Sequence, residues 1–291
     1  MIVLPRIMVT GLGGFVGRHV SASLARRAEL LAANVDGRRA DLLIAADRAS
    51  LFSDGAPEIL LHLAWETEHG KFWASPANSG WEDASADLFS RFYDAGGQRV
   101  IGIGTCAEYD WTTGEERFVE DAPLAPHTAY GAAKVRTAET LRRIAEGAGG
   151  TFAWGRVFFS FGAGEPPARL IPAILRAVRS GDPLGIGPST TVRDFWHVRH
   201  LGDAIAALCL SEVTGPVNLS SGLGVTFGAL AGIANRLGRA DLIRPDARAL
   251  GPGEPRLLVG DTTVLRESVG YTPPDLLAED LAAYAETFPR A

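Results

Sequence analysis

Tyr130 and Lys134 are the two residues whose types and spacing most directly suggest chemistry in this sequence. They stand four positions apart in a predicted helix, so both side chains lie on one helix face. An ammonium group beside a phenol favours the phenolate and lowers the tyrosine pKa, which gives an acid/base group usable near neutral pH. Thr105, at the end of the preceding predicted strand, could bond the same substrate oxygen. Because this spacing is common, the alternative is a surface pair without a chemical role.

A glycine-rich stretch at residues 10–17 predicts a phosphate-binding turn, because it lies between an apolar run at 2–9 and a segment with apolar residues at helical spacing at 18–28. Gly11, Gly14 and Gly17 would allow a positive-φ turn, a close approach to a pyrophosphate and close packing of helix on strand. The free N–H groups and the dipole at the helix start suit an anion. We therefore predict a dinucleotide site. The alternative is a glycine-rich turn without a ligand.

The end of the second predicted strand, residues 30–35, carries the residues that would distinguish NAD from NADP. Asp36 could bond the ribose hydroxyls, as an acidic residue at this point typically does. Arg38 or Arg39 could instead hold a 2′-phosphate. Asp36 could also be a plain turn residue, because an Asp-Gly pair favours turns. The expected cofactor is therefore NAD or NADP.

Composition argues against several classes of function. The chain has 291 residues, 46% of them hydrophobic and 21% charged, as in ordinary globular proteins. A net charge of −6 with scattered basic residues argues against a nucleic-acid surface. No apolar run approaches the ~20 residues that span a bilayer, and the N-terminus lacks a signal pattern, so we expect a cytoplasmic protein without membrane contact. Two cysteines give neither a disulfide framework nor a metal quartet, and we expect no metal site.

The elements that must position these residues alternate between strand and helix. Further strands are expected at 59–64, 99–104, 151–161, 191–198 and 217–219, and helices at 49–55, 81–95, 128–148, 169–180, 201–210, 227–237 and from 276. The link from Asp36 to Asp41 is so short that the usual second helix is missing or very short. The pattern predicts an α/β fold, a Rossmann-type doubly wound parallel sheet with a smaller C-terminal α/β part. Residues 1–160 would form the NAD(P)-binding domain, with 192–222 returning to it, and 161–191 with 223–291 the substrate-binding part.

Two residues near the predicted strand at 59–64 have different expected roles. His62 lies within the apolar run, where a histidine is more often a hydrogen-bonded core residue than a ligand. Trp65 follows the strand directly and would project from its carboxyl end, where ligands bind in open α/β sheets.

Several motifs occur in a characteristic order along nearly the whole chain: residues 10–17, His62-Leu63-Ala64, Thr105 four residues before Tyr109, Tyr130 with Lys134, Arg193-Asp194-Phe195, and the stretches 218–222 and 258–261. In this order and spacing the chain resembles the extended short-chain dehydrogenase/reductase family of nucleotide-sugar epimerases, dehydratases and reductases. The combination favours the catalytic interpretation of Tyr130 and Lys134 over the surface pair.

The resemblance implies a role for each motif. Tyr130 would donate or accept the proton at the reacting carbon's oxygen, Lys134 would bond the nicotinamide ribose, and Thr105 would bond the substrate oxygen. Arg193 would hold the diphosphate of a nucleotide sugar, which a bidentate guanidinium suits, and Cys106 would also contact the substrate. An Arg193–Asp194 structural pair is the alternative. The residues that would bind the cofactor are Gly11, Gly13, Gly14, Phe15, Val16, Gly17, Asp36, Arg38, Asp41, Leu42, Leu63, Ala64, Tyr130 and Lys134.

Departures from the family's patterns favour one branch of it. Dehydratases place an acidic residue two positions after the threonine, but Ala107 stands here, and a methyl group cannot act as a general base. Phe159 replaces the asparagine that epimerases often carry after the active-site helix. The short link at 36–41 and the runs at 251–255 and 270–273 look most like the 4-keto-6-deoxy sugar nucleotide reductases.

We therefore expect NAD(P)H-dependent reduction of the C4 ketone of a nucleotide-linked 4-keto-6-deoxy sugar, with Tyr130 as proton donor. One alternative is a nucleotide-sugar epimerase with tightly bound NAD. Another is an inactive NAD(P)-sensing or scaffold protein, against which the intact set of Thr105, Tyr130 and Lys134 argues. The resemblance also implies a homodimer, formed through the helix at 81–95 and the helix that carries Tyr130.

Overall fold

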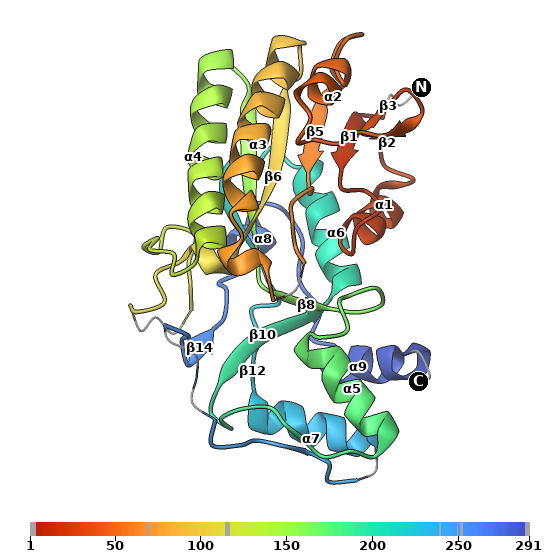
Figure 1. Ribbon diagram of the computed structural model, residues 1–291, viewed down its shortest axis with the longest axis vertical. Coiled ribbons are helices and arrows are strands. Elements are labelled where there is room, and N and C mark those ends of the chain that lie inside the picture. Colours follow the sequence, from red (N-terminus) through yellow and green to blue (C-terminus); the bar gives the residue numbers. More distant parts are fainter. Residues whose placement is uncertain are drawn as a thin grey trace.

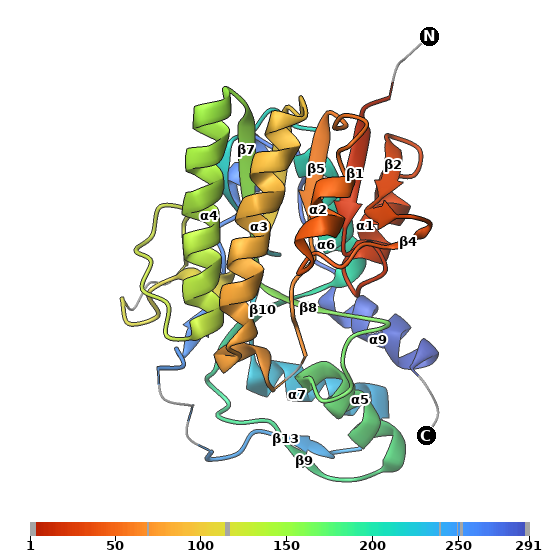
Figure 2. The ribbon, with the colours of Figure 1, turned by 45° about the horizontal axis from the view of Figure 1, so that its top comes forward.

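A six-stranded parallel sheet with helices on both faces forms the larger part of the molecule, and a smaller part lies at one end of it (Figure 1, Figure 2). The computed structural model describes residues 4–68, 70–113, 117–238, 240–248, 250 and 253–288. The strand order in the large sheet is β11-β7-β6-β5-β1-β2. This arrangement is the Rossmann-type doubly wound α/β fold that the sequence predicts.

The large sheet is buried on both faces, which is why its strands read as apolar runs in the sequence. Its strands are β1 (Arg6–Thr10), β2 (Glu29–Ala32), β5 (Ile59–His62), β6 (Arg99–Thr105), β7 (Thr151–Val157) and β11 (Gly215–Leu219). Along β1, Ile7 and Val9 belong to one core cluster and Met8 to the other, as alternation on a strand requires.

Two layers of helices cover these faces. One face is covered by α1 (Gly17–Leu24), α6 (Val198–Cys209) and α8 (Thr263–Glu267). The other is covered by α3 (Ala77–Asp94) and α4 (Ala129–Ala148), which lie side by side, with the short α2 (Ala45–Ser50) beside them (Figure 2). No helix among the described residues is both long enough and apolar enough to cross a membrane.

The smaller part carries its own core of buried apolar side chains. It contains β8 (Phe159–Phe161), β10 (Val192–His197), β12 (Gly224–Thr226), β14 (Leu257–Leu258), the two-stranded pair β9 (Leu184–Gly185) and β13 (Ile243–Arg244), and the helices α5 (Leu170–Ser180), α7 (Phe227–Gly238) and α9 (Leu277–Thr287). Strand β10 pairs here, whereas α6 and β11 after it join the large sheet. The division into two domains stays a prediction, and we propose that the chain returns to the first domain at α6.

The segment between β2 and α2 differs from its prediction. Instead of continuing to residue 35, the second strand ends at Ala32, and β3 (Asn34–Val35) pairs with β4 (Arg38–Arg39) as an antiparallel hairpin. Asp36 and Gly37 form its turn with φ angles of 49° and 75°, the conformation of a type I′ turn. The helix expected at 49–55 lies earlier in the chain, at Ala45–Ser50, and Asp47 in its first turn accepts hydrogen bonds from Arg38 of the hairpin and from the Asp41 nitrogen.

Parts of two predicted features lie outside the described residues. They are positions 1–3, which include the start of the first predicted strand, and positions 251–252 in the proline-rich run.

Candidate active site

The glycine turn lies where the carboxyl ends of β1 and β5 meet, and there the chain order of the sheet reverses. Gly11 has a φ of 73°, and a Cβ at this position would lie 2.9 Å from the Ala64 nitrogen. A Cβ on Gly17, the first residue of α1, would lie 2.3 Å from the Gly11 carbonyl oxygen. Gly13 and Gly14 are exposed in front of the helix start. This backbone therefore fits the pyrophosphate of a dinucleotide.

We expect Gly17→Ala to raise the Kd for NADH or NADPH roughly 10–100-fold, because relieving the contact with Gly11 requires backbone strain of about 1–3 kcal/mol in the turn. Isothermal titration calorimetry measures the Kd. Gly147→Ala is the matched control, since a Cβ there meets nothing within 4 Å. Wild-type affinity in Gly17→Ala would show that the turn does not bind the cofactor.

A buried hydrogen-bond chain joins the two strands beneath this turn. Thr10 Oγ1 accepts from the Ala64 nitrogen at 3.2 Å and lies 2.9 Å from His62 Nδ1. His62 Nε2 lies 3.0 Å from Ser85 Oγ. Burial, with the Lys134 charge, lowers the pKa of His62 to about 3. His62 is therefore the neutral core residue that the sequence predicts, and it links β1 and β5 to α3 beneath the glycine turn.

The residues proposed to bind the adenosine end of the cofactor lie on the β3–β4 hairpin and on the segment between this hairpin and α2. Asp36 stands at the tip of the β3–β4 hairpin, as the turn interpretation expects. Both Nη atoms of Arg38 donate to Asp47, at 2.6 and 2.7 Å, and this pairing holds the pKa of Asp47 at about 2. The Leu42 side chain is buried in the core, while Leu43 and Ile44 beside it are exposed. Leu43 and Ile44 were not selected by the sequence analysis. They are the large apolar side chains of this segment that are exposed to solvent.

The start of α4, which carries Tyr130, lies against the turn that follows β6 and Thr105. Thr128 caps α4 by accepting from the Gly131 nitrogen at 3.0 Å. A Cβ on Gly131 would lie 2.4 Å from the Ala107 carbonyl oxygen, so the helix start touches the 3-10 turn η2 (Cys106–Glu108). Thr105 caps this turn, and its Oγ1 accepts from the Ala107 nitrogen at 3.2 Å.

Aromatic side chains surround Tyr130 on the side of η1 (Phe72–Ala74). The Tyr130 ring lies edge-on to those of Phe72, Trp73 and Trp65, with centroids 4.8, 5.8 and 6.4 Å away. Tyr130 is only 9% exposed, whereas Trp73 is 38% exposed. Burial is the main cause that raises the pKa of the Tyr130 phenol. Because its pKa is raised, the Tyr130 phenol is protonated near neutral pH. The rings of Phe72, Trp73 and Trp65 form an apolar wall beside it.

The Lys134 side chain lies on the same face of α4 as Tyr130, and its ammonium group bonds the backbone of β6. Its Nζ donates to the Ile103 carbonyl oxygen at 2.8 Å and lies 3.8 Å from the centroid of the Trp65 ring. The distance to the Tyr130 ring centroid is 5.9 Å. Burial lowers the pKa of Lys134 to about 7. The expected lowering of the tyrosine pKa by this ammonium is absent from the described structure, because the ammonium lies against Trp65 and burial of the phenol dominates.

Arg193 is buried in the smaller part, with Glu254 rather than Asp194 as its partner. Its Nη2 lies 2.6 Å from a Glu254 oxygen, and its guanidinium carbon lies 5.8 and 5.9 Å from the ring centroids of Phe159 and Phe227. Asp194 instead accepts from the Ser221 and Gly222 nitrogens. A cavity of about 240 Å³ adjoins this cation and shares Phe227 and Glu254 with it. Cys106 lies buried at η2, where burial raises the pKa of its thiol to about 12.

Arg169 and Glu165 are two charged residues near the site that the sequence analysis missed. The Arg169 guanidinium lies 6.0 Å from the Phe15 ring centroid of the glycine turn and 3.8 Å from Glu165. Its charge favours the Tyr130 phenolate, although less strongly than burial opposes it. Burial raises the pKa of Glu165 to about 7. The available signal was an arginine at the start of a helix, where the helix dipole disfavours a positive charge.

The comparison with family models finds the NAD dependent epimerase/dehydratase family, whose model matches residues 7–219. This range runs from β1 through β11 and includes the glycine turn, Thr105, Tyr130, Lys134 and Arg193.

The relatives of this chain include two proteins that are named for a reaction at position 4 of a sugar. The chain is 28% identical to dTDP-6-deoxy-L-talose 4-dehydrogenase (NAD(P)(+)) of Kitasatospora kifunensis, over 94% of this chain and 92% of that protein. It is 26% identical to UDP-glucose 4-epimerase of Azospirillum brasilense, over 92% and 87%. A similar solved structure is UDP-N-acetylglucosamine 4-epimerase of Methanobrevibacter ruminantium M1, with a TM-score of 0.86, 22% identity and 99% of both chains covered.

Proposed function

Because the chain belongs to the NAD-dependent epimerase/dehydratase family, we propose that it reduces the 4-keto group of a nucleotide-linked 4-keto-6-deoxy sugar. The family is NAD(P)-dependent and of the extended short-chain dehydrogenase/reductase type. The proposal adds the direction of the reaction and the class of sugar.

The observation that carries the proposal is the protonated, buried Tyr130 beside η2, where Ala107 stands two positions after Thr105. Burial raises the pKa of its phenol, which suits a proton donor to an alkoxide. Ala107, whose carbonyl lies against the start of α4, offers no carboxylate for eliminating water. When bound, the reduced nicotinamide supplies a hydride to the carbonyl carbon. Tyr130 then protonates the oxygen, to which the Thr105 hydroxyl also bonds.

Two further features support a 6-deoxy sugar nucleotide as substrate. The wall formed by Phe72, Trp73 and Trp65 suits the methyl group of a 6-deoxy sugar better than a hydroxymethyl group, which would lose hydrogen bonds to water there. Arg193, with the cavity beside it, suits the diphosphate and nucleoside. The relative from Kitasatospora kifunensis is named for a reaction at position 4 of a 6-deoxy sugar.

The second candidate is a nucleotide-sugar 4-epimerase, favoured by the relative from Azospirillum brasilense. The two functions differ in whether the cofactor is consumed. We would incubate the purified protein with NADH or NADPH and a panel of 4-keto-6-deoxy sugar nucleotides and follow the absorbance of the reduced nicotinamide. Stoichiometric loss with one substrate would support the reductase. No loss, together with nicotinamide that remains bound through purification, would favour the epimerase.

Homodimerisation through α3 and α4 stays a prediction. These helices pack against each other (Figure 2), and Arg136 of α4 bonds Glu82 of α3 at 2.8 Å. Size-exclusion chromatography with light scattering would measure the oligomeric state, and a monomer at assay concentrations would contradict it.

A further inference from the structure

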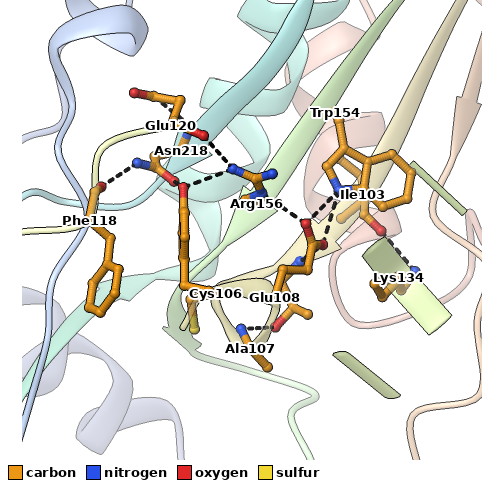
Figure 3. Close-up of polar contacts among 12 residues, drawn as sticks. Ile103, Cys106, Ala107, Glu108, Phe118, Glu120, Lys134, Trp154, Arg156 and Asn218 are labelled. Atoms are coloured by element: carbon orange, nitrogen blue, oxygen red, sulfur yellow. Dashed lines mark hydrogen bonds and ion pairs between the residues drawn. The ribbon is translucent and has the colours of Figure 1, made fainter. Parts of the chain in front are cut away.

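Glu108 is a carboxylate buried directly behind the Thr105 turn, and none of the roles above uses it. Its side chain is 0% exposed. One of its oxygens accepts from the Thr105 nitrogen at 2.9 Å, and Trp154 Nε1 lies 3.0 and 3.1 Å from the two oxygens. The other oxygen accepts from Arg156 Nε at 2.8 Å. Figure 3 shows this carboxylate between the indole, the guanidinium and the η2 backbone.

Arg156 links Glu108 to a second group of buried polar atoms. Its Nη1 donates to the Tyr109 hydroxyl at 3.1 Å and to the Glu120 carbonyl oxygen at 2.7 Å. The Tyr109 hydroxyl donates to Asn218 at 2.7 Å, and a Glu120 carboxylate oxygen accepts from the Asn218 nitrogen at 2.9 Å. The buried charges are therefore paired and hydrogen-bonded (Figure 3), which is the condition for keeping ions inside a protein.

The backbone is shaped for the Glu108 carboxylate. A Cβ on Gly104 would lie 2.1 Å from its Oε1 and 2.2 Å from Trp154 Nε1, so only glycine fits there. Thr105 and Glu108 also form a reciprocal capping box across η2. The carboxylate thus fixes the turn that presents the Thr105 hydroxyl.

The Glu108 carboxylate also affects the ionisation of Tyr130. The start of α4 touches η2 through Gly131 and Ala107. The ionisable groups around the phenol are Glu108 and Cys106 on η2, Arg169 before α5, and Lys134 on its own helix. After burial, the Glu108 charge contributes most to raising the pKa of Tyr130, and the same charge opposes the lowering of the pKa of Lys134.

We propose that Glu108 is a positioning residue of the active site: held by Arg156 and Trp154, it fixes the turn that presents the Thr105 hydroxyl, and it places a fixed negative charge on η2, against which the start of α4 with Tyr130 lies. The kinetic part of this inference rests on the proposed roles of Thr105 and Tyr130. The ionisation of Tyr130 can be measured without any substrate.

The test compares Glu108→Gln with Glu120→Gln. Both remove a carboxylate from the same network, but Glu120 contacts Asn218 rather than the Thr105 turn. The proteins would be produced with difluorotyrosine, whose phenols ionise nearer neutral pH. The ¹⁹F signal of residue 130 is identified by its loss in Tyr130→Phe and followed against pH. We expect its ionisation midpoint to fall by about one pH unit or more in Glu108→Gln and to stay at the wild-type value in Glu120→Gln.

In the enzyme assay, Glu108→Gln should lower kcat about tenfold or more with little change in KM, because the turn presenting Thr105 loosens. The alkaline limit of the reduction rate should also move to lower pH. Glu108→Asp keeps the charge but is one methylene shorter, so it should retain the ionisation midpoint and lose turnover.

Equal midpoints in Glu108→Gln, Glu120→Gln and the wild type would overturn the proposal, even if Glu108→Gln is less stable. If Glu108→Gln does not fold, the double variant Glu108→Gln/Arg156→Met is compared with Arg156→Met alone, so that the two proteins differ only in the Glu108 charge. Absence of activity in the wild type would count against the proposed function alone, because the NMR comparison needs no turnover.

Discussion

Replacing Tyr130 with phenylalanine is expected to lower kcat by about 10²–10⁴-fold, the usual contribution of a positioned proton donor. The substitution removes one hydroxyl and keeps the ring that packs against Phe72 and Trp73. Fold and cofactor affinity should therefore stay close to those of the wild type. Consumption of the reduced nicotinamide gives kcat, and calorimetric titration gives the Kd of the cofactor.

Tyr93→Phe is the matched control for this experiment. Tyr93 is a buried tyrosine on α3 whose hydroxyl donates to the Thr151 carbonyl oxygen at 2.6 Å, at the opposite end of β6 and β7 from η2. It should lose a modest amount of stability, about 1 kcal/mol, and keep its turnover. A Tyr130→Phe enzyme with more than a tenth of the wild-type rate would mean that another group donates the proton.

The features of the candidate site whose geometry could be predicted from the sequence are those that local chemistry determines. The glycine turn requires its residues within a few positions of one another, and Gly11 and Gly17 have the contacts that only glycine allows. Tyr130 and Lys134 share a helix face because of the helical repeat. The Thr105–Glu108 spacing was also visible as a capping box, and it would have drawn attention to Glu108 if it had been read as such.

The parts that could not be predicted depend on contacts between distant segments. Sequence spacing does not show that Trp65 receives the Lys134 ammonium, or that Arg156 of β7 pairs with Glu108. Of the β3–β4 hairpin, only the Asp-Gly turn could be predicted from the sequence. Whether Asp36 ends a strand or begins a turn depends on Asp47 of α2, which accepts hydrogen bonds from Arg38 and from the Asp41 nitrogen. A pKa is hardest to predict, since burial of Tyr130 outweighs the lysine that spacing places near it.

The buried ion pair between Arg156 and Glu108 leads to the largest expected change in stability. Arg156→Met should lower the free energy of unfolding by about 3–5 kcal/mol, because it leaves the fully buried Glu108 without its cation. For a chain of this size we expect a fall in Tm of about 10 °C. Tyr109 and the Glu120 carbonyl oxygen lose a donor in the same variant. Thermal and denaturant unfolding, followed by circular dichroism, measure both quantities.

Arg142→Met separates burial from the simple loss of an ion pair. Arg142 bonds Glu139 and Glu146 at 2.7 and 2.6 Å on the surface of α4, and its side chain is 42% exposed. Its removal should cost about 1 kcal/mol or less. Adding Glu108→Gln to Arg156→Met should restore part of the lost stability, because no charge then stays buried alone. If Arg156→Met were as mild as Arg142→Met, water would have to reach Glu108, and a carboxylate so solvated could neither hold the Thr105 turn in place nor impose its charge on Tyr130.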